Sequence, residues 1–395
     1  MRRLRIASVG AGSEAGSRTW AYLNVINALP DMYELSAICD HSAERAQAAA
    51  DAYGCSTIHT DLDVMLAEDK PDVVLRMAPT DSCVGISVRA AEAGCHVLTE
   101  IPIAPTLPMA DRIIDACRAN GVKLEVAENV FLWPQELLKR KVVEAGLLGK
   151  IVHTRLTYPC GTYHGMNAIR MVTGRDPVRV LGYAGKVEIE GKLSYGGDPM
   201  PWAYWEGATL DFGDFKCLYE LPPKNRAWRR HWDVEGTRGY LEADDLHLYE
   251  GDEEKRYAIE RTEDGDGVLQ RLHVETDPVI EWQNPYARYG ISDMDDIAKA
   301  ALLESMYRMV VDDAAPVYGA ENARKDQEIA VALRESDLRG NVWMDLPLTE
   351  VTGLEERIHA AFREKYGCDP VDDIDGQLKA TYDRSAVMWN EVGWL

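Results

Sequence analysis

The stretch LRIASVGAG, from Leu4 to Gly12, is the feature that most constrains the fold of this chain. An apolar strand runs directly into Gly10 and Gly12, and Ala15 completes a Gly-x-Gly-x-x-Ala spacing. Glycine suits a tight turn whose backbone approaches a pyrophosphate, and the following helix offers its N-terminal amides to the anion. The neighbouring segments, a helical SRTWAYLNVINAL and an apolar YELSAICD, supply the context that this motif needs. We therefore predict a dinucleotide-binding turn here.

Strand-like and helix-like segments continue to alternate up to residue 128. Helices of this length between short apolar strands predict a parallel, doubly wound sheet with right-handed crossovers, and hence an α/β fold. Ligands of such sheets bind at the carboxyl ends of the strands. The segments expected on that rim, besides the glycine turn, are Met77-Ala78-Pro79, Glu100-Ile101-Pro102 and Glu128-Asn129.

Asp40 ends the second predicted strand, 30 residues after Gly10. A carboxylate at this point binds the ribose hydroxyls and repels a 2′-phosphate, so it favours NAD over NADP as the cofactor. The alternative is that Asp40 only caps the helix that follows, because Asp is a good N-cap residue.

Composition excludes several classes of partner. The formal charge of −23 would repel the phosphates of nucleic acids and of anionic membranes. No run of about 18 apolar residues is present, which argues against a membrane span. The eight cysteines are scattered, without spacings suited to zinc, so we expect a reduced, cytoplasmic protein with no structural metal.

Over about residues 1–348 the sequence resembles the Gfo/Idh/MocA oxidoreductases, which act mostly on sugars and cyclitols. The resemblance rests on the glycine turn, on Asp40, and on the order of six segments: MAPTDSC, AGCHVLTEIP, VAENVFLWPQ, AGLLGKI, YHGMNAIRMVTG and YGAENARKDQEIAVAL. It implies a Rossmann NAD-binding domain over 1–128 and an α+β substrate and oligomerisation domain with an open, mostly antiparallel sheet over 129–348. A helical extension over 349–395 is expected to dock on its own chain or on a neighbouring subunit. The resemblance also implies a homo-oligomer, either a dimer or a tetramer.

The sequence departs from the family at its ionisable positions. Dehydrogenases of the family carry Glu-Lys-Pro at the rim, whereas this chain has Ile101 in place of the lysine. Cys160 and Asn167 replace two aspartates of the second domain, while His164 is retained. The Glu-Ile-Pro and Glu-Asn segments are similar to those of the family's NAD-dependent glycosidases, including the α-N-acetylgalactosaminidase type. In those enzymes a bound cofactor oxidises the sugar at C3, the aglycone leaves by elimination, water adds and the hydride returns.

His164 is the strongest catalytic candidate, because histidine exchanges protons near neutral pH. The alternative is a structural histidine bonded to a carbonyl. Tyr163 and Tyr158 are further candidates as acids or sugar hydrogen-bonders, although Tyr163 would point away from the site of His164 if the stretch were extended. The cofactor-binding residues that we expect are Gly10, Gly12, Ser13, Ala15, Asp40, Ala78, Pro79, Glu100, Ile101, Pro102 and Asn129.

The segment KNRAWRRHW is the densest positive cluster of an acidic chain. Tryptophan stacks on sugar faces and arginine binds anions bidentately, a combination that suits an acidic sugar such as a uronate, a sugar phosphate or sulfoquinovose. An exposed strand edge with solvated arginines is the alternative. The substrate-binding residues that we expect are Arg226, Trp228, Arg229, Arg230, His231 and Asn167.

Three hypotheses for function follow, all with a small-molecule sugar as the ligand. The first is an NAD-dependent glycosidase acting on an anionic glycoside, such as a sulfoquinovoside. The second is an NAD-dependent sugar or cyclitol dehydrogenase in which His164 replaces the missing lysine as the base. The third is a non-catalytic NAD- or sugar-binding protein.

Overall fold

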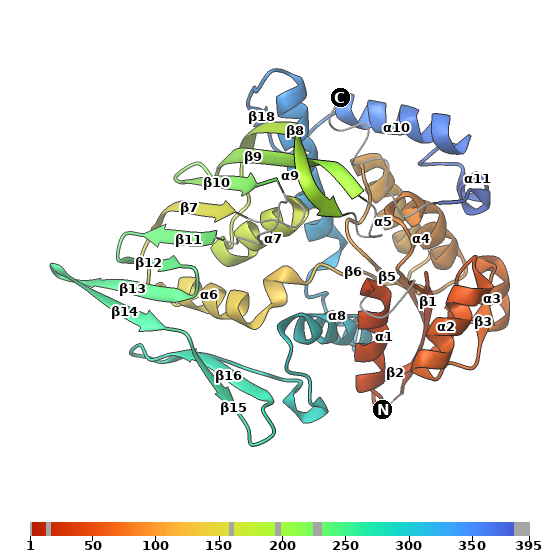
Figure 1. Cartoon of the computed structure of the whole chain (residues 1–395), viewed down its shortest axis with the longest axis horizontal. Coiled ribbons are helices and arrows are strands. Elements are labelled where there is room, and N and C mark those ends of the chain that lie inside the picture. The colour runs from red at the N-terminus through yellow and green to blue at the C-terminus, as the bar shows by residue number, and fades with distance from the viewer. Residues whose placement is uncertain (1, 13–16, 158–161, 194–198, 224–230, 383–395) are drawn as a thin grey trace. The chain divides into compact units, whose positions relative to one another are not determined.

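The computed structural model describes residues 2–12, 17–157, 162–193, 199–223 and 231–382 (Figure 1). The chain forms two compact units. The first combines Met1–Asn129 and Asp295–Gln327 with the C-terminal stretch that begins at Glu355. The second combines Val130–Met294 with Glu328–Leu354.

The first unit is built on a six-stranded sheet in the order β3-β2-β1-β4-β5-β6, in which every pair is parallel. The order reverses between β1 and β4, and a dinucleotide binds at such a reversal. The doubly wound parallel sheet predicted from the alternating segments is therefore confirmed. Its strands are β1 (Leu4–Val9), β2 (Tyr33–Cys39), β3 (Ile58–His59), β4 (Val73–Arg76), β5 (His96–Thr99) and β6 (Leu124–Val126).

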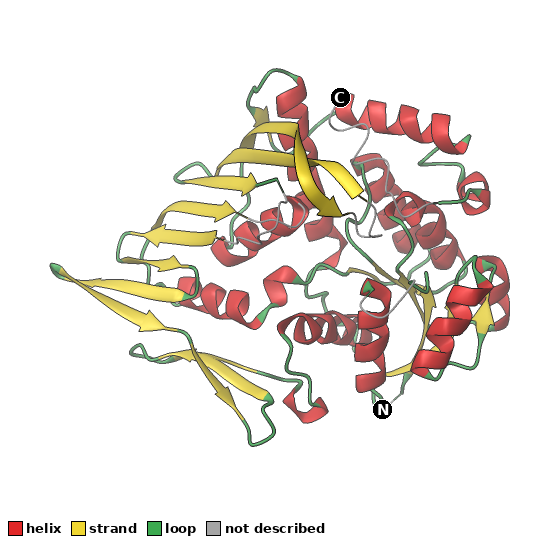
Figure 2. Cartoon of the chain, viewed as in Figure 1, coloured by secondary structure: helices red, strands yellow, loops and turns green. Residues whose placement is uncertain are grey.

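Helices join these strands (Figure 2). Pro79 and the 3-10 turn η1 (Thr80–Ser82) follow β4, and they lead into a helix that is buried along most of its length. The α-helices of this part are α1 (Arg18–Ala28), α2 (Ala43–Tyr53), α3 (Leu62–Glu68), α4 (Cys83–Glu92) and α5 (Leu107–Ala119).

Later segments of the chain complete the first unit. They include most of α8 (Met294–Val311), the start of α9 (Gly319–Leu338), nearly all of α10 (Gly353–Tyr366), and α11 (Ile374–Lys379). The hydroxyl of Tyr33 donates to the carbonyl of Leu303 at 2.7 Å. The buried carboxylate of Glu125 accepts from the amide of Gly319 at 2.6 Å. Long-range hydrogen bonds of this kind attach the helices to the sheet.

The second unit contains a nine-stranded sheet in the order β14-β13-β12-β11-β7-β10-β9-β8-β18 and a three-stranded sheet β15-β16-β17. All of its pairs are antiparallel except β7 with β10. The prediction of a mostly antiparallel second sheet is thus confirmed. The strands are β7 (Ile151–Thr157), β8 (Arg179–Leu193), β9 (Pro199–Asp211), β10 (Lys216–Leu221), β11 (His231–Gly236), β12 (Gly239–Glu242), β13 (Asp245–Glu250), β14 (Glu253–Ala258), β15 (Glu260–Glu263), β16 (Leu269–Val274), β17 (Ile280–Gln283) and β18 (Met344–Asp345).

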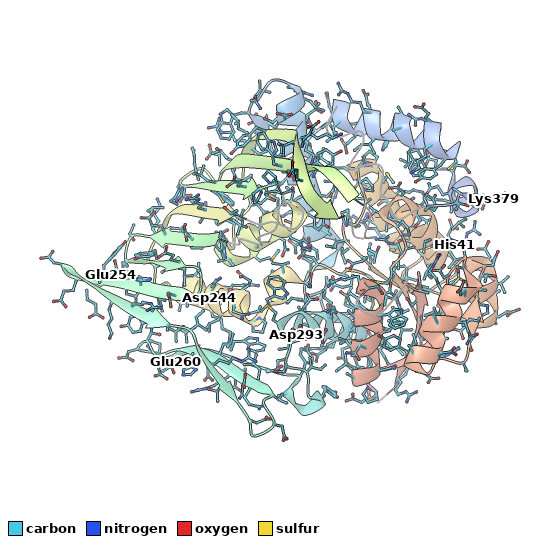
Figure 3. The ribbon with its side chains drawn as sticks, in the orientation of Figure 1. His41, Asp244, Glu254, Glu260, Asp293 and Lys379 are labelled. Atoms are coloured by element: carbon cyan, nitrogen blue, oxygen red, sulfur yellow. The ribbon has the colours of Figure 1, made fainter. Side chains whose placement is uncertain are left out.

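Two helices of the second unit, α6 (Pro134–Glu144) and α7 (Thr162–Thr173), carry apolar faces against these sheets. Strands β14 and β15 instead expose their acidic side chains. Glu254 and Glu260 mark them in Figure 3. Within the described residues, no helix has the length and apolar character needed to cross a membrane.

The cysteines that the structure describes, seven in all, are free thiols. Across the same described part of the chain, no group of three or more potential metal ligands comes together.

Candidate cofactor and catalytic sites

The glycine turn lies directly after β1, at the point where the sheet order reverses. Gly10 has φ +99° and Gly12 has φ +72°, a conformation that favours glycine. A Cβ on Gly10 would lie 2.7 Å from the backbone nitrogen of Ala78, so the turn packs directly on the loop after β4. A bare backbone of this shape fits a dinucleotide pyrophosphate, and binding of the cofactor at this turn stays a prediction. Ser13 and Ala15 lie outside the described residues.

Asp40 connects the end of β2 to this turn. Its Oδ2 accepts from the amide of Ala11 at 2.9 Å, and its Oδ1 accepts from Ser42 N at 2.9 Å and Arg45 Nη2 at 2.6 Å. Burial alone would raise the pKa of the Asp40 carboxyl, but Arg45 and the two amides lower it overall. Ser42, rather than Asp40, is the N-cap of α2, so the capping alternative for Asp40 is wrong.

Asp40→Ser is expected to weaken NAD binding about 10- to 100-fold, because a hydrogen bond to a charged group contributes about 1.5–3 kcal/mol. The variant also frees Arg45 to meet a 2′-phosphate, so the preference for NAD over NADP should fall. Fluorescence titration with NADH and with NADPH measures both effects. Asp51→Ser, which changes an exposed aspartate of α2, is the control. Equal affinity of the unmodified protein for the two cofactors would contradict the role given to Asp40.

A buried arginine joins the ends of β4 and β5. Arg76 is 1% exposed, and burial lowers the pKa of its guanidinium. Its Nε donates to Thr99 Oγ1 at 2.5 Å, its Nη1 donates to the carbonyl of Ala78 at 2.9 Å, and its Nη2 donates to the carbonyl of Glu100. One side chain thus fixes both rim loops. Sequence reasoning missed Arg76, although a charge at the end of the apolar strand VVLR was a signal.

Dehydrogenases of the Gfo/Idh/MocA family carry a lysine at the corner of residues 100–102. In this chain the same corner contains an ion pair between Arg18 and Glu100. Arg18 Nε lies 2.5 Å from Glu100 Oε1, and Glu100 Oε2 accepts from the amide of Ile101 at 2.7 Å. Both oxygens of the Glu100 carboxylate are therefore engaged. The Ile101–Pro102 peptide is cis.

Arg18 belongs to a wider charge network of the first unit. Its Nη1 lies 3.0 Å from Asp295 Oδ2, and its guanidinium carbon lies 5.1 Å from the ring centroid of Tyr22. Asp295 also accepts from Asn129 Nδ2 and pairs with Lys299 at 2.7 Å. Burial alone would lower the pKa of Arg18, but Glu100, Tyr22 and Asp295 raise it, so the guanidinium stays charged.

The sheet thus brings most of the predicted cofactor residues to one rim. Arg76 ties Ala78 to Glu100, and the network of Arg18 ties Glu100 to Asn129 through Asp295. Contact of Glu100 and Asn129 with the cofactor stays a prediction.

His164 lies in the second unit, at the third residue of α7. Because the helix has already begun at Thr162, the extended geometry that would have turned Tyr163 away does not apply. The two rings are tilted against each other with centroids 4.6 Å apart. His164 is 8% exposed, and Asn167, one turn further along α7, is fully buried.

A close helix–sheet contact fixes the place of His164. A Cβ on Gly165 would lie 2.3 Å from the ring of Tyr219 on β10, so only glycine lets α7 approach the sheet this closely. Tyr158 and Cys160 lie outside the described residues.

The positive cluster KNRAWRRHW is described only at its end. Arg226, Trp228, Arg229 and Arg230 lie outside the described residues, and His231 is described only as the first residue of β11. Trp232, in contrast, is 1% exposed, and its Nε1 donates to Glu136 Oε2 at 3.0 Å. Trp232 therefore packs inside the second unit and does not offer its ring to a sugar.

The parallel sheet, the glycine turn and the carboxylate after β2 define a Rossmann fold of the dinucleotide-binding kind. Residues 4–128 match the model of the Gfo/Idh/MocA family, described as an oxidoreductase family with an NAD-binding Rossmann fold. Over these residues the chain is thus similar to the NAD-binding domain of the Gfo/Idh/MocA oxidoreductases.

Curated relatives match parts of the chain. D-glucoside 3-dehydrogenase of Escherichia coli K12 is 36% identical over 162 residues, which are 40% of this chain and 44% of the relative. A glycosyl hydrolase family 109 protein of Shewanella sp. W3-18-1 is 26% identical over 164 residues, 39% of this chain and 35% of the relative. The matches thus span less than half of the length of these relatives.

Solved structures share the fold over most of the chain. A levoglucosan dehydrogenase in complex with NADH and levoglucosan superposes with a TM-score of 0.68 at 17% identity. The superposition covers 88% of this chain and 100% of that one. An oxidoreductase domain protein from Kribbella flavida gives a TM-score of 0.67 at 20% identity, with the same coverage.

Proposed function

We propose that this protein is an NAD-dependent glycoside hydrolase that cleaves its substrate through transient oxidation at C3 of the sugar. The observation that carries the proposal is the corner at residues 100–102. Residue 101 is an uncharged isoleucine, and both oxygens of Glu100 are engaged, one by Arg18 and the other by the amide of Ile101. The corner thus offers an uncharged side chain at residue 101 and a carboxylate that is already paired, so it supplies no lysine to take a proton from a hydroxyl.

The reaction balances without a second substrate other than water. NAD held at the glycine turn and Asp40 would supply the hydride acceptor for oxidation of C3 and the donor for its later reduction. The proton of the C3 hydroxyl passes to a base and returns in the reverse step. While C3 is a ketone, the proton on C2 is acidic, so a base removes it and the aglycone leaves from C1 as the C1–C2 double bond forms. Water then adds across that bond and the hydride returns to C3, so glycoside plus water gives free sugar plus aglycone.

His164 is the base and acid that we assign to these proton transfers. A positioned imidazole accepts and returns a proton near neutral pH, which both the C2 and the hydroxyl steps require. Tyr163 lies against it, with ring centroids 4.6 Å apart, and a phenol there can pass a proton to a leaving group. Tyr158 is the third candidate for the same role.

The names of two relatives support parts of this sequence of steps. The D-glucoside 3-dehydrogenase is named for oxidation at the carbon that the proposal oxidises first, and the family 109 protein is named as a glycosyl hydrolase. An NAD-dependent sugar or cyclitol dehydrogenase is the second candidate, favoured by the dehydrogenase names of several relatives. The two candidates share the first step and differ in whether the hydride returns.

An anionic sugar is the substrate class that we assign. The basis is the sequence cluster of Lys224, Arg226, Arg229, Arg230 and His231 in a chain of net charge −23. A uronide, a glycoside of a phosphorylated sugar and a sulfoquinovoside are the members to compare.

The fate of the hydride distinguishes the two candidates. Purified protein with NAD is incubated with 4-nitrophenyl glycosides of neutral and anionic sugars while nitrophenol and NADH absorbance are both followed. We expect many nitrophenol molecules released per NAD present, with no accumulation of NADH. Accumulation of NADH in proportion to oxidised sugar, without nitrophenol, would replace the hydrolase by the dehydrogenase.

A further inference from the structure

Part of the C-terminal extension packs on the sheet that carries the glycine turn. We call residues 355–382 the C-terminal brace. Its side chains at Glu355 and Phe362 are fully buried, and Gln377 is 1% exposed. The described part of the extension therefore docks on its own chain, one of the two arrangements expected from the sequence. Residues 383–395 lie outside the described part.

The brace caps the helix that follows β4. Ser82 is the N-cap residue of α4, but it makes no side-chain cap hydrogen bond and instead donates to the carbonyl of Pro79 at 2.7 Å. Gln377 caps the helix in its place, because the Oε1 of Gln377 accepts from the amide of Gly85 at 2.9 Å. A Cβ on Gly85 would lie 3.0 Å from the Cβ of Gln377, so glycine permits the close approach. An orphan amide of the first turn is thereby satisfied from the far end of the sequence.

The brace also caps the helix that follows β5. Thr106 is the N-cap residue of α5 and again makes no side-chain cap hydrogen bond, since its Oγ1 lies 2.8 Å from Nε2 of His359. Oε1 of Glu355 accepts from the amide of Leu107 at 2.7 Å. A carboxylate at a helix N-terminus is favoured by the helix dipole. Serine and threonine normally cap their own helices, but the side chains that accept from the first-turn amides here are Gln377 and Glu355 of the brace.

A third contact reaches the loop that backs the glycine turn. The hydroxyl of Tyr366 donates to Asp81 Oδ2 at 2.6 Å, and Asp81 is 2% exposed within η1. Ala78, three residues earlier in the same loop, is the residue whose backbone nitrogen would contact a Cβ on Gly10. The brace is therefore attached to the loop at residues 77–82 and, through Leu107, to the end of the loop at residues 100–106.

We propose that Glu355, Tyr366 and Gln377 are positioning residues for bound NAD, which fix the two rim loops and so make release of the cofactor slow. Release requires local opening of the loops around the ligand, and contacts that hold them closed act on the dissociation rate more than on association. The proposal goes beyond the choice of reaction, because it concerns the rim of the NAD-binding domain and holds for a hydrolase or a dehydrogenase. An enzyme that returns its hydride has no need to exchange its cofactor.

Dissociation of NADH from the purified protein, without any sugar, tests the proposal. Protein loaded with NADH is mixed with excess NAD, and the loss of energy transfer from tryptophan to NADH gives the rate. Trp20, whose Nε1 donates to the carbonyl of Ala11 at 3.0 Å, provides a donor at the turn. We expect Gln377→Leu and Glu355→Ala to speed release, about tenfold when combined, a size typical of losing helix caps. Glu355→Gln, which keeps the acceptor, should restore slow release.

The matched control is Asp375→Asn, which removes the ion pair of an exposed aspartate of α11 with Arg89 and leaves both caps in place. It should keep the parent rate. Hydrogen exchange on the unliganded protein should be faster at the amides of Gly85 and Leu107 in the two capping variants only. Lower melting temperatures with an unchanged NADH dissociation rate would overturn the proposal and leave the brace a purely structural element. If the combined variant does not fold, Tyr366→Phe applies the same test with the loss of one hydroxyl.

Discussion

His164→Ala is expected to lower kcat on a cleavable aryl glycoside by at least about a hundredfold. A positioned general acid or base typically contributes about 10²- to 10⁴-fold to a rate. Because His164 is only 8% exposed, buffer molecules have little access to its place and should not replace its proton transfer. NADH affinity should stay within about twofold, because we assign cofactor binding to the glycine turn and Asp40 and assign only proton transfer to His164. Initial rates and a fluorescence titration on the same preparation measure the two quantities.

A second histidine of the same unit serves as the control for this variant. His153 on β7 is partly exposed and lies 4.0 Å from Glu235, so His153→Ala should keep the parent rate. Tyr163→Phe distinguishes the role of Tyr163 from that of His164, because it removes the hydroxyl and keeps the packing of the ring against His164. Full activity of His164→Ala would remove the central catalytic assignment, and a larger loss in Tyr163→Phe would move it to the phenol.

Arg76→Met is expected to lower the free energy of unfolding by about 3 kcal/mol. Methionine fills most of the volume but leaves the partly buried carbonyls of Ala78 and Glu100 without their donor, and each such group costs about 1–3 kcal/mol. Because those carbonyls belong to the two rim loops, NAD affinity should fall with stability. Urea unfolding followed by circular dichroism measures the first effect, and NADH titration measures the second.

Arg89→Met is the matched comparison for Arg76→Met. Arg89 forms ion pairs with Asp63 and Asp375 at the surface of α4, and such exposed pairs contribute about 0–1 kcal/mol. Its loss should leave NAD affinity unchanged. Equal destabilisation by the two substitutions would show that the buried hydrogen bonds of Arg76 are not what holds the rim loops together.

Local sequence patterns were enough to predict the first sheet. Strands β1, β2, β4, β5 and β6 coincide with apolar segments of the sequence, and glycines and prolines between the segments mark the turns. The two-residue strand β3 has no such pattern and was not predicted. The turn at Gly10 could be predicted because its backbone conformation depends on residue type. Asp40 could be placed at the end of β2, although its bond to Ala11 needs the fold to be known.

Contacts between distant segments could not be predicted from those patterns. Ser82 and Thr106 look like ordinary N-caps in the sequence, and only the folded chain brings Gln377 and Glu355 to their helices. Trp232 follows a run of basic residues and was interpreted as part of a sugar-binding cluster, but the alternation of β11 directs it inward onto Glu136. The register of a strand decides the face of each side chain, and a basic neighbourhood does not reveal it.

Arg18 illustrates a further limit of sequence reasoning. The absence of a lysine at residue 101 was visible, whereas the arrival of a cation from α1 at Glu100 was not, because 82 positions separate the pair in the chain. Through this ion pair an arginine from α1, and not a lysine at residue 101, provides the positive charge at the corner of residues 100–102. Arg18 and the amide of Ile101 orient the Glu100 carboxylate beside the backbone of Ile101.

The central claim is that the sugar is oxidised only transiently, and deuterium incorporation tests it most directly. The protein is incubated with NAD and a cleavable glycoside in deuterated water, and the released sugar is analysed by NMR. The proposed reaction removes the C2 proton while C3 is a ketone, so we expect deuterium at C2, hydrogen retained at C3 and no net NADH. Sugar released with hydrogen still at C2 would contradict the account, because cleavage would then have occurred without the ketone.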